Sequence, residues 1–188
     1  MSGRQVFKYL KPILLIFISI LKILPPFIRK FLFDLSSSIP TRIGVLIRYI
    51  LIKSLAKRCG DNVYIGRWVV IKNPEMLSLS DNISLHEYCY VDAQGGIDIG
   101  REVSIAHNCS LISFEHTFDV HDVSIKYQPI KNKQIVINNN VWLGCGVRVL
   151  AGTVIGEKTV IAANSVTKGE LEGGYIYAGL PAKAIKNI

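Results

Sequence analysis

The chain has 188 residues, enough for one modest domain and an appendage. Hydrophobic residues make up 49% of it, the mean hydropathy is +0.33 and the formal net charge is +8. Residues 1–60 contain eleven Lys and Arg against one acid, whereas residues 61–188 contain eleven against thirteen. The cations of the first third alternate with aliphatic residues rather than with hydrogen-bonding polar ones, which argues against nucleic acid as a partner.

Residues 1–58 are predicted to form an apolar, basic, helical segment. Pro12–Leu21 is uninterrupted by charge, Ile23–Ile28 continues it after Lys22, and Ile43–Leu55 is again apolar with interspersed Arg and Lys. A helix that spans a membrane needs about 20 apolar residues, and here a lysine and two prolines intervene. Apolar stretches with cationic flanks are typical of helices that lie in the membrane interface. We therefore expect contact with a membrane surface through residues 1–58.

Two alternatives for this segment stay open. Its helices could pack on the rest of the chain or on a partner subunit. They could also form a membrane span or a cleaved signal peptide, although no small-x-small cleavage site precedes Pro25. Four cysteines give little sign of a secreted disulfide scaffold. The expected location is therefore cytoplasmic, peripheral at the inner face of the cell membrane.

A six-residue period runs through the second half of the chain. Four positions after most of the periodic residues stands a small or β-branched residue, such as Val141 or Thr153. This period indicates a parallel β-helix, in which each hexapeptide is one flat side of a triangular coil. The periodic residues should point inward, and Gly144 and Gly156 should ease the turns. The periodic residues are Ile137, Leu143, Val149, Ile155, Ile161 and Thr167.

The same period extends upstream with interruptions. Two gaps of eight residues suit a bulge or a short corner loop, and Cys89 and Cys109 occupy positions that call for small hydrophobic residues. The coil is therefore predicted over residues 59–170, followed by a C-terminal tail, residues 171–188. The upstream periodic residues are Ile65, Ile71, Leu79, Leu85, Val91, Ile99, Ile105 and Leu111.

One interruption is much longer than the others. From Leu111 to Ile137 there are 26 positions, so about 20 residues are ejected from the coil as a loop, residues 112–136. Long loops in compact repeat folds are usually functional or disordered. This loop holds His116 and His121, which makes it the expected place for chemistry.

The region from Asp98 to Lys186 carries a family resemblance. It contains the segments IDIGREVSIAHNCSLISFEH, INNNVWLGCGVRVLAGTVIGEKTVIAANSVTKG and YAGLPAKAIK. Together, the coil repeat, the histidine-bearing loop and these motifs resemble the hexapeptide-repeat acyltransferases, in particular the galactoside, maltose and antibiotic O-acetyltransferases and those that modify bacterial surface polysaccharides. The resemblance covers about half of the chain and leaves the N-terminal third outside. It implies a left-handed parallel β-helix, a homotrimer with active sites between subunits, acetyl-coenzyme A as co-substrate and a hydroxyl acceptor.

The resemblance also implies roles for individual residues. His116 matches the catalytic general base, and the backbone N–H of Cys145 is the expected oxyanion donor. An acid should orient the imidazole, and by position in the sequence Asp119 is preferred to Glu115, which flanks His116 directly and should point away. No metal is expected. His86, which stands where the family usually has an asparagine, and Tyr88 are the candidate acceptor-binding residues. The residues matched to the coenzyme site are Trp142, Gly144, Ala163, Thr167, Lys168, Lys183 and Lys186.

The expected function is transfer of an acetyl group to a hydroxyl of a bacterial surface saccharide or a lipid-linked sugar. One alternative is a non-catalytic β-helix scaffold docked on a membrane. Another is a γ-type carbonic anhydrase, which would need three histidines such as His86, His116 and His121 around zinc. That family carries its ligands on the coil, whereas His116 and His121 lie in the ejected loop, so the transferase is preferred.

Overall fold

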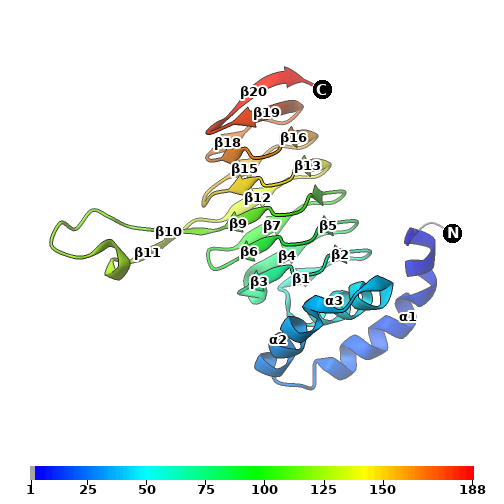
Figure 1. The fold of residues 1–188 in the computed structure, drawn as a ribbon. Helices are drawn as coiled ribbons and strands as arrows, with labels where there is room; N and C mark the ends of the chain where they lie inside the picture. Colours follow the sequence, from blue (N-terminus) through cyan, green and yellow to red (C-terminus); the bar gives the residue numbers. More distant parts are fainter. Residues whose placement is uncertain (1–2) are drawn as a thin grey trace.

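The computed structural model describes residues 3–188, with the main chain only for residues 3–6, 8 and 10. Residues 58–187 form a left-handed parallel β-helix with three flat faces, and three helices cover its N-terminal end (Figure 1). Face A consists of β1 (Arg58–Cys59), β4 (Leu77–Leu79), β7 (Ile97–Ile99), β12 (Ile135–Ile137), β15 (Val154–Ile155) and β18 (Glu170–Leu171).

The other two faces have the same parallel stacking. Face B consists of β2 (Tyr64–Ile65), β5 (Ser84–Leu85), β8 (Ser104–Ile105), β13 (Val141–Leu143), β16 (Thr159–Ile161), β19 (Tyr175–Gly179) and the antiparallel end strand β20 (Ala182–Asn187). Face C consists of β3 (Val70–Lys72), β6 (Tyr90–Asp92), β9 (Ser110–Ile112), β14 (Arg148–Val149) and β17 (Val166–Thr167).

The predicted period is confirmed by the core. Leu143 on β13 is paired in register with Ile105 below it and Ile161 above it, and all three side chains are fully buried. Every periodic residue from Ile65 to Thr167 is buried in the same way, as are the small residues at the corners. Equivalent positions therefore stack on one another along the coil, and their apolar side chains fill its interior.

The corners explain where glycine is needed. The third residue after an inward aliphatic residue has positive φ, as at Asn140, Gly146 and Asn164. Gly144 and Gly156 do not, so the expectation that they supply turn flexibility is wrong. A Cβ on Gly144 would lie 2.6 Å from the Ala163 nitrogen of the next coil, and one on Gly156 would meet Gly173 in the same way. Close approach of stacked backbones requires these two glycines.

The coil continues beyond residue 170. Leu171 on β18 and Tyr177 on β19 are buried members of the core, and β20 folds back on β19 to close the C-terminal end. The segment expected as a tail thus supplies the last strands of two faces. The peptide bond between Leu180 and Pro181, in the turn before β20, is cis.

The ejected loop is an ordered arm. β10 (Phe114–His116) and β11 (Ile130–Asn132) pair as an antiparallel hairpin that projects from the coil (Figure 1). Beyond them lies a short 3₁₀ helix, η3 (Ile125–Tyr127). The Gln128 side chain is 5% exposed and bonds the main chain of Val120 and Val123, which fixes the tip of the arm.

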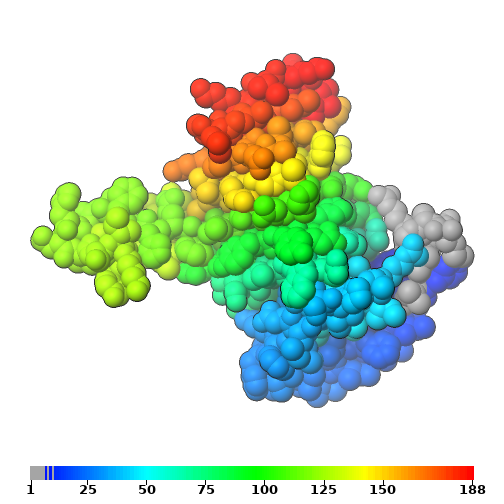
Figure 2. All heavy atoms as spheres, in the orientation of Figure 1, coloured from blue at the N-terminus to red at the C-terminus, as the bar shows by residue number. Residues whose placement is uncertain are grey.

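The helical cap consists of α1 (Gly3–Leu21), α2 (Pro26–Leu35) and α3 (Thr41–Leu55), with η1 (Ser36–Ser38) before α3 and η2 (Pro74–Met76) in the coil beneath. α3 packs directly on the coil, with Ile52 fully buried, and α1 and α2 form a layer outside it. Figure 2 shows the cap spread over one end of the coil. Among the helices of residues 3–188, none is long and apolar enough to cross a membrane.

Arg48 joins the cap to the coil. Its side chain is 1% exposed, and its guanidinium donates to the carbonyls of Ile65 in β2 at 2.9 Å, Ser36 at 2.8 Å and Ile39 at 3.0 Å. The Arg29 guanidinium likewise donates hydrogen bonds to the carbonyls of Leu24 and Ser54. These cations of the first third are therefore structural donors rather than a solvated charged face.

We predict that Arg48→Met destabilises the protein strongly, because the Ile65 and Ile39 carbonyls lose their donor and the Ser36 carbonyl keeps only the Ile39 N–H. The free energy of unfolding should fall by about 3 kcal/mol or more, since each unsatisfied buried group costs ~1–3 kcal/mol. Urea unfolding followed by circular dichroism would measure it. The exposed Arg42 provides the control, because Arg42→Met should change stability by less than about 0.5 kcal/mol. Equal effects of the two substitutions would contradict the role of Arg48.

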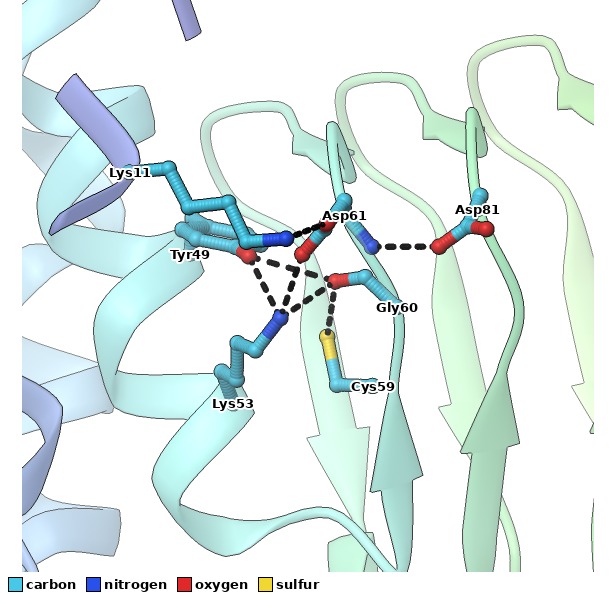
Figure 3. Close-up of polar contacts among 7 residues, drawn as sticks. All are labelled: Lys11, Tyr49, Lys53, Cys59, Gly60, Asp61 and Asp81. Carbon is cyan, nitrogen blue, oxygen red and sulfur yellow. Dashed lines mark hydrogen bonds and ion pairs between the residues drawn. The ribbon is translucent and has the colours of Figure 1, made fainter. Parts of the chain in front are cut away.

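A second contact fastens α1 and α3 to the first coil (Figure 3). The Asp61 carboxylate accepts from Lys53 of α3 at 2.9 Å and from Lys11 of α1, while the Asp61 N–H donates to Asp81 of the next coil at 2.7 Å. Burial alone would raise the pKa of Asp61, but the two lysines outweigh it and lower this pKa below its ordinary value. Lys53 also donates to the hydroxyl of Tyr49, which is nearly buried.

The Asp61 contact predicts a pH-dependent contribution to stability. Because the pKa of Asp61 is lowered in the folded state, its contribution is complete above the unfolded value of about 3.9 and is lost as pH falls through the folded value. Asp61→Asn should cost about 1 kcal/mol or less at pH 7, since the side chain is 36% exposed. The difference from wild type should vanish in acid unfolding titrations. A pH-independent difference would contradict this account.

Candidate functional site

Two of the predicted coenzyme-site residues, Trp142 and Lys186, lie in one row across the strands of face B. Trp142 on β13 is 53% exposed and pairs with Ser104 on one side and Val160 on the other. Val160 pairs with Ile176, which pairs with Lys186 on β20. With strands about 4.8 Å apart, Trp142 and Lys186 are roughly 14 Å apart on one face of the sheet. An aromatic surface and a cation at this separation suit a long ligand with an anionic end.

A shallow pocket lies beside Trp142, at the corner between faces B and C. It has a volume of about 420 Å³ and is lined by His86, Glu87, Tyr88, Ser104, Ala106, His107 and Trp142. His86 and Tyr88, the predicted acceptor-binding residues, therefore share one pocket with the predicted coenzyme-site tryptophan. Tyr88 is 59% exposed and sits at a positive-φ corner position, which directs it outward.

Polar contacts hold one wall of this pocket. The Tyr64 hydroxyl donates to Glu87 Oε1 at 3.0 Å, and the His86 Nδ1 lies 3.8 Å from Glu87 Oε2. The rings of Tyr64 and His86 are 5.4 Å apart. Burial alone would raise the pKa of Glu87, but hydrogen bonds from its own N–H and from Tyr64, with the charges of His86 and Arg67, lower it on balance. Glu87 is thus an anion in the wall of the pocket.

The corner also presents backbone donors. Two residues after an inward aliphatic residue of this corner, the N–H groups of His107, Cys145 and Ala163 have no hydrogen-bond partner within residues 3–188. The carbonyl of Cys145 is used to accept from Asn164 at 2.8 Å. The Cys145 N–H is thus free to donate to a ligand, and its role as oxyanion donor stays a prediction.

His116 lies elsewhere, on the projecting hairpin. It is paired with Ile130 across the hairpin, and its side chain is exposed. In the described part of the chain, neither the His116 imidazole nor the exposed Asp119 carboxylate has a hydrogen-bond or ion-pair partner, and the two do not bond each other. Glu115 instead pairs with Lys133 at the base of the hairpin, and this bond lowers the pKa of Glu115. Asp119 as orienting acid therefore stays a prediction.

Two residues matched to the coenzyme site lie on the hairpin side of the coil. Lys168 follows β17 at the corner where the hairpin leaves, and its charge acts on Glu115. Thr167 is fully buried in the core, with its hydroxyl 3.4 Å from the Arg148 carbonyl. Its side chain cannot line a surface channel, so a contribution from Thr167 would have to come from its main chain. Lys183 and Lys186 are exposed on β20.

One chain therefore holds the predicted site in two separate groups. The first comprises the face B row and its corner pocket, and the second comprises the hairpin with Lys168. Figure 1 shows the hairpin leaving the coil on the opposite side from β13 and β5. Within residues 3–188 no group of three His, Cys, Asp or Glu side chains is placed to hold a metal ion, so the histidines of the carbonic anhydrase alternative are not assembled in one chain.

Four lining residues of the pocket were not singled out from the sequence as site residues: Ser104, Ala106, His107 and Glu87. Each stands in the same coil position as a recognised neighbour, because Ser104 pairs with Trp142 and the His107 corner position corresponds to that of Cys145. Aligning the sequence coil by coil, rather than hexapeptide by hexapeptide, would have placed these residues beside the predicted ones. Tyr64, which holds Glu87, gives no such signal.

Comparison with known proteins agrees with this architecture. Residues 134–169 match the family model of the bacterial transferase hexapeptide (six repeats). The chain is 33% identical over 118 residues to the lipopolysaccharide biosynthesis O-acetyl transferase WbbJ of Escherichia coli (strain K12), covering 59% of this chain and 60% of that protein. It is 26% identical over 160 residues to the galactoside O-acetyltransferase of the same organism, covering 85% and 77%.

A solved structure of a galactoside acetyltransferase in complex with coenzyme A superposes with a TM-score of 0.75 at 23% identity, covering 86% of this chain and 78% of that one. The expected fold, a left-handed parallel β-helix, is thus confirmed, and residues 134–169 match its hexapeptide repeats. The resemblance to the hexapeptide-repeat acyltransferases is confirmed as well. The chain spans 60% of the length of WbbJ.

The four thiols should differ in reactivity. Cys89 and Cys109 are buried, and burial raises the pKa of Cys59 to about 12, whereas Cys145 is partly exposed at the corner. Because the thiolate is the reactive form, we predict that limited iodoacetamide labelling at pH 8 modifies Cys145 first. Peptide mass spectrometry would identify the site, with labelling in urea as the control in which all four react. Preferential labelling of Cys59 would contradict the described geometry of α3 and β1.

Proposed function

We propose that this protein transfers an acetyl group from acetyl-coenzyme A to a hydroxyl of a saccharide, with His116 as general base. The observation that carries the proposal is the exposed His116 on an ordered arm, without a partner inside the chain, so that its imidazole is free to accept a proton. The named activities of the similar proteins are acetyl transfer to saccharide-type acceptors, which supports the reaction class.

The reaction requires a proton to move in both directions. His116 accepts the proton of the acceptor hydroxyl as its oxygen attacks the thioester carbonyl carbon. The Cys145 N–H donates to the carbonyl oxygen as negative charge develops there. When the carbon–sulfur bond breaks, protonated His116 returns the proton to the leaving thiolate. An imidazole suits both steps because its ordinary pKa lies near neutrality. No covalent enzyme intermediate is needed, so Cys145 contributes only its main chain.

Face B is the proposed path of the coenzyme. The Trp142 ring offers an apolar surface for the pantetheine arm, the free amides at the corner offer donors for its carbonyls, and Gly144 and Ala163 keep the corner shallow. Lys183 and Lys186 lie at the C-terminal end of the same face, where they can bind the phosphates. Lys168, on the hairpin side, would meet this ligand only from a neighbouring chain.

We infer that the working form is a homotrimer. The hairpin and the face B row lie on different sides of one chain, so a complete site needs the hairpin of one chain to reach the face B corner of the next. Residues His86, Tyr88 and His107 in the pocket would then contact the acceptor opposite the imidazole. A monomeric mass in solution, together with full activity, would contradict this arrangement.

The acceptor is proposed to be a sugar of a surface polysaccharide or its lipid-linked precursor. The pocket offers imidazole, phenol and hydroxyl groups rather than a cluster of cations, as suits a neutral polyol. The similarity to WbbJ, named for lipopolysaccharide biosynthesis, supports this class of acceptor.

We predict that His116→Ala lowers kcat by about 10²–10⁴-fold with little change in KM for acetyl-coenzyme A, because a general base acts in the transition state. The assay is release of free coenzyme A, corrected for hydrolysis, with a panel of sugars and lipid-linked saccharides. His121→Ala is the matched control, since His121 lies on the same arm and is also exposed, and it should retain activity close to wild type. Unchanged turnover in His116→Ala would remove this residue from the mechanism.

A further inference from the structure

The outer layer of the cap presents an uncovered apolar surface. In α1, the side chains that face α3 and the coil include Phe7, Leu14 and Leu21. A second stripe lies on the opposite side, with the spacing of one helical face. Its members are Ile13, Ile16, Phe17 and Ile20, which are 52%, 62%, 52% and 56% exposed.

The stripe continues into α2. In α2, Phe33 and Arg29 are buried. Exposed apolar residues follow one another at intervals of four, from the turn after α1 to the end of α2. These outward residues are Ile23, Phe27, Phe31 and Leu35, which are 81%, 72%, 60% and 57% exposed. Eight large apolar side chains of the outer layer are thus each more than half exposed. Contiguous apolar surface of this kind marks an interaction site rather than ordinary surface variation.

An apolar groove adjoins the stripe. It has a volume of about 270 Å³ between the three helices and is lined by Leu21, Leu32, Leu35, Ser36, Ile39, Ile47, Ile50 and Leu51. Leu35 belongs to both the groove and the stripe. No charged residue lines the groove, so its natural occupants are hydrocarbon groups.

The charge of the cap favours an anionic partner. Within the part of the chain that the structure describes, the buried Arg29 and Arg48 bond main-chain carbonyls rather than carboxylates, so no acid neutralises them. Asp61 pairs with two lysines at once, Lys22 and Arg42 are exposed, and residues 1–60 contain a single acid. A second copy of this cap would carry the same positive charge and be repelled, whereas anionic lipid headgroups would be attracted.

We propose that the outer face of α1 and α2 docks on an anionic lipid bilayer, with both helices lying in the interface plane. Such helices bury their apolar face about 5–10 Å deep between headgroups and acyl chains, and Lys22 and Arg42 reach the phosphates. The cap lies at one end of the coil, and the hairpin leaves the coil from its side (Figures 1 and 2). Docking therefore leaves the hairpin and face B accessible. The proposal does not depend on the acetyl-transfer chemistry.

The test is flotation of the full chain with vesicles of phosphatidylcholine alone and of phosphatidylcholine mixed with phosphatidylglycerol. We expect binding to the mixed vesicles that weakens as salt is raised. The double variant Phe17→Glu, Ile20→Glu should bind at least ~10-fold more weakly, because two large apolar side chains no longer enter the bilayer. The matched control is Ile185→Glu, Ile188→Glu, which changes side chains of similar exposure, 64% and 52%, at the other end of the coil.

Thermal unfolding by circular dichroism would show that both double variants remain folded, as expected for exposed positions. A second variant pair, Lys22→Gln with Arg42→Gln, should reduce binding to anionic vesicles and leave the helical signal unchanged. Absence of vesicle binding by the wild-type chain would overturn the proposal. Equal binding by the wild-type chain and the Phe17→Glu, Ile20→Glu variant would also overturn it. So would a wild-type chain that self-associates but does not bind vesicles, if the variant loses that self-association. Acetyl transfer to a soluble sugar is expected to proceed in the variants of the cap, so failure of one proposal would not be mistaken for failure of the other.

Discussion

Backbone stacking at the spacing of one β-strand is the constraint on which the rest of this structure depends. Each position of a coil lies directly above its counterpart in the coil below, so every coil must have the same shape. This explains the fully buried column Ile105, Leu143 and Ile161. It also explains Gly144, since a Cβ there would strike the backbone of the next coil. Departures from the period are confined to the outside, as corner insertions or as the hairpin.

The same stacking builds the candidate site without any dedicated loop on face B. His86 and Trp142 lie two coils apart, yet they share one pocket. Each stands next to the inward leucine of its coil on face B, and the coils stack in register. The corner amides form a ladder of donors for the same reason. The exception is His116, which needs an arm that leaves the coil. The pocket on face B and the hairpin that carries His116 are thus separate features of one chain, and the proposed trimer would bring them together.

The cap solves a different physical problem. An open end of a β-helix exposes unpaired strand edges and the apolar interior, which invites aggregation. Here α3 covers the first coil, and Arg48 satisfies carbonyls from the coil and from the turn before α3. Covering the end requires one apolar helix face, yet α1 and α2 are apolar on their outer side as well. This additional apolar surface is the physical basis for the proposal that the outer layer docks on a lipid bilayer.

The sequence by itself determined the coil, the ejected arm and the helical nature of the first third, because a six-residue period admits one architecture and the apolar runs with cationic flanks suit helices. It also singled out His116, Trp142 and Cys145 as candidate site residues, through motifs tied to that architecture. Only the tertiary structure decided that Arg29 and Arg48 serve as buried donors, that Thr167 is a core residue, and that Glu87 and His107 line the pocket. Those facts depend on which coils and helices meet, and residues far apart in the chain meet only after stacking fixes their register.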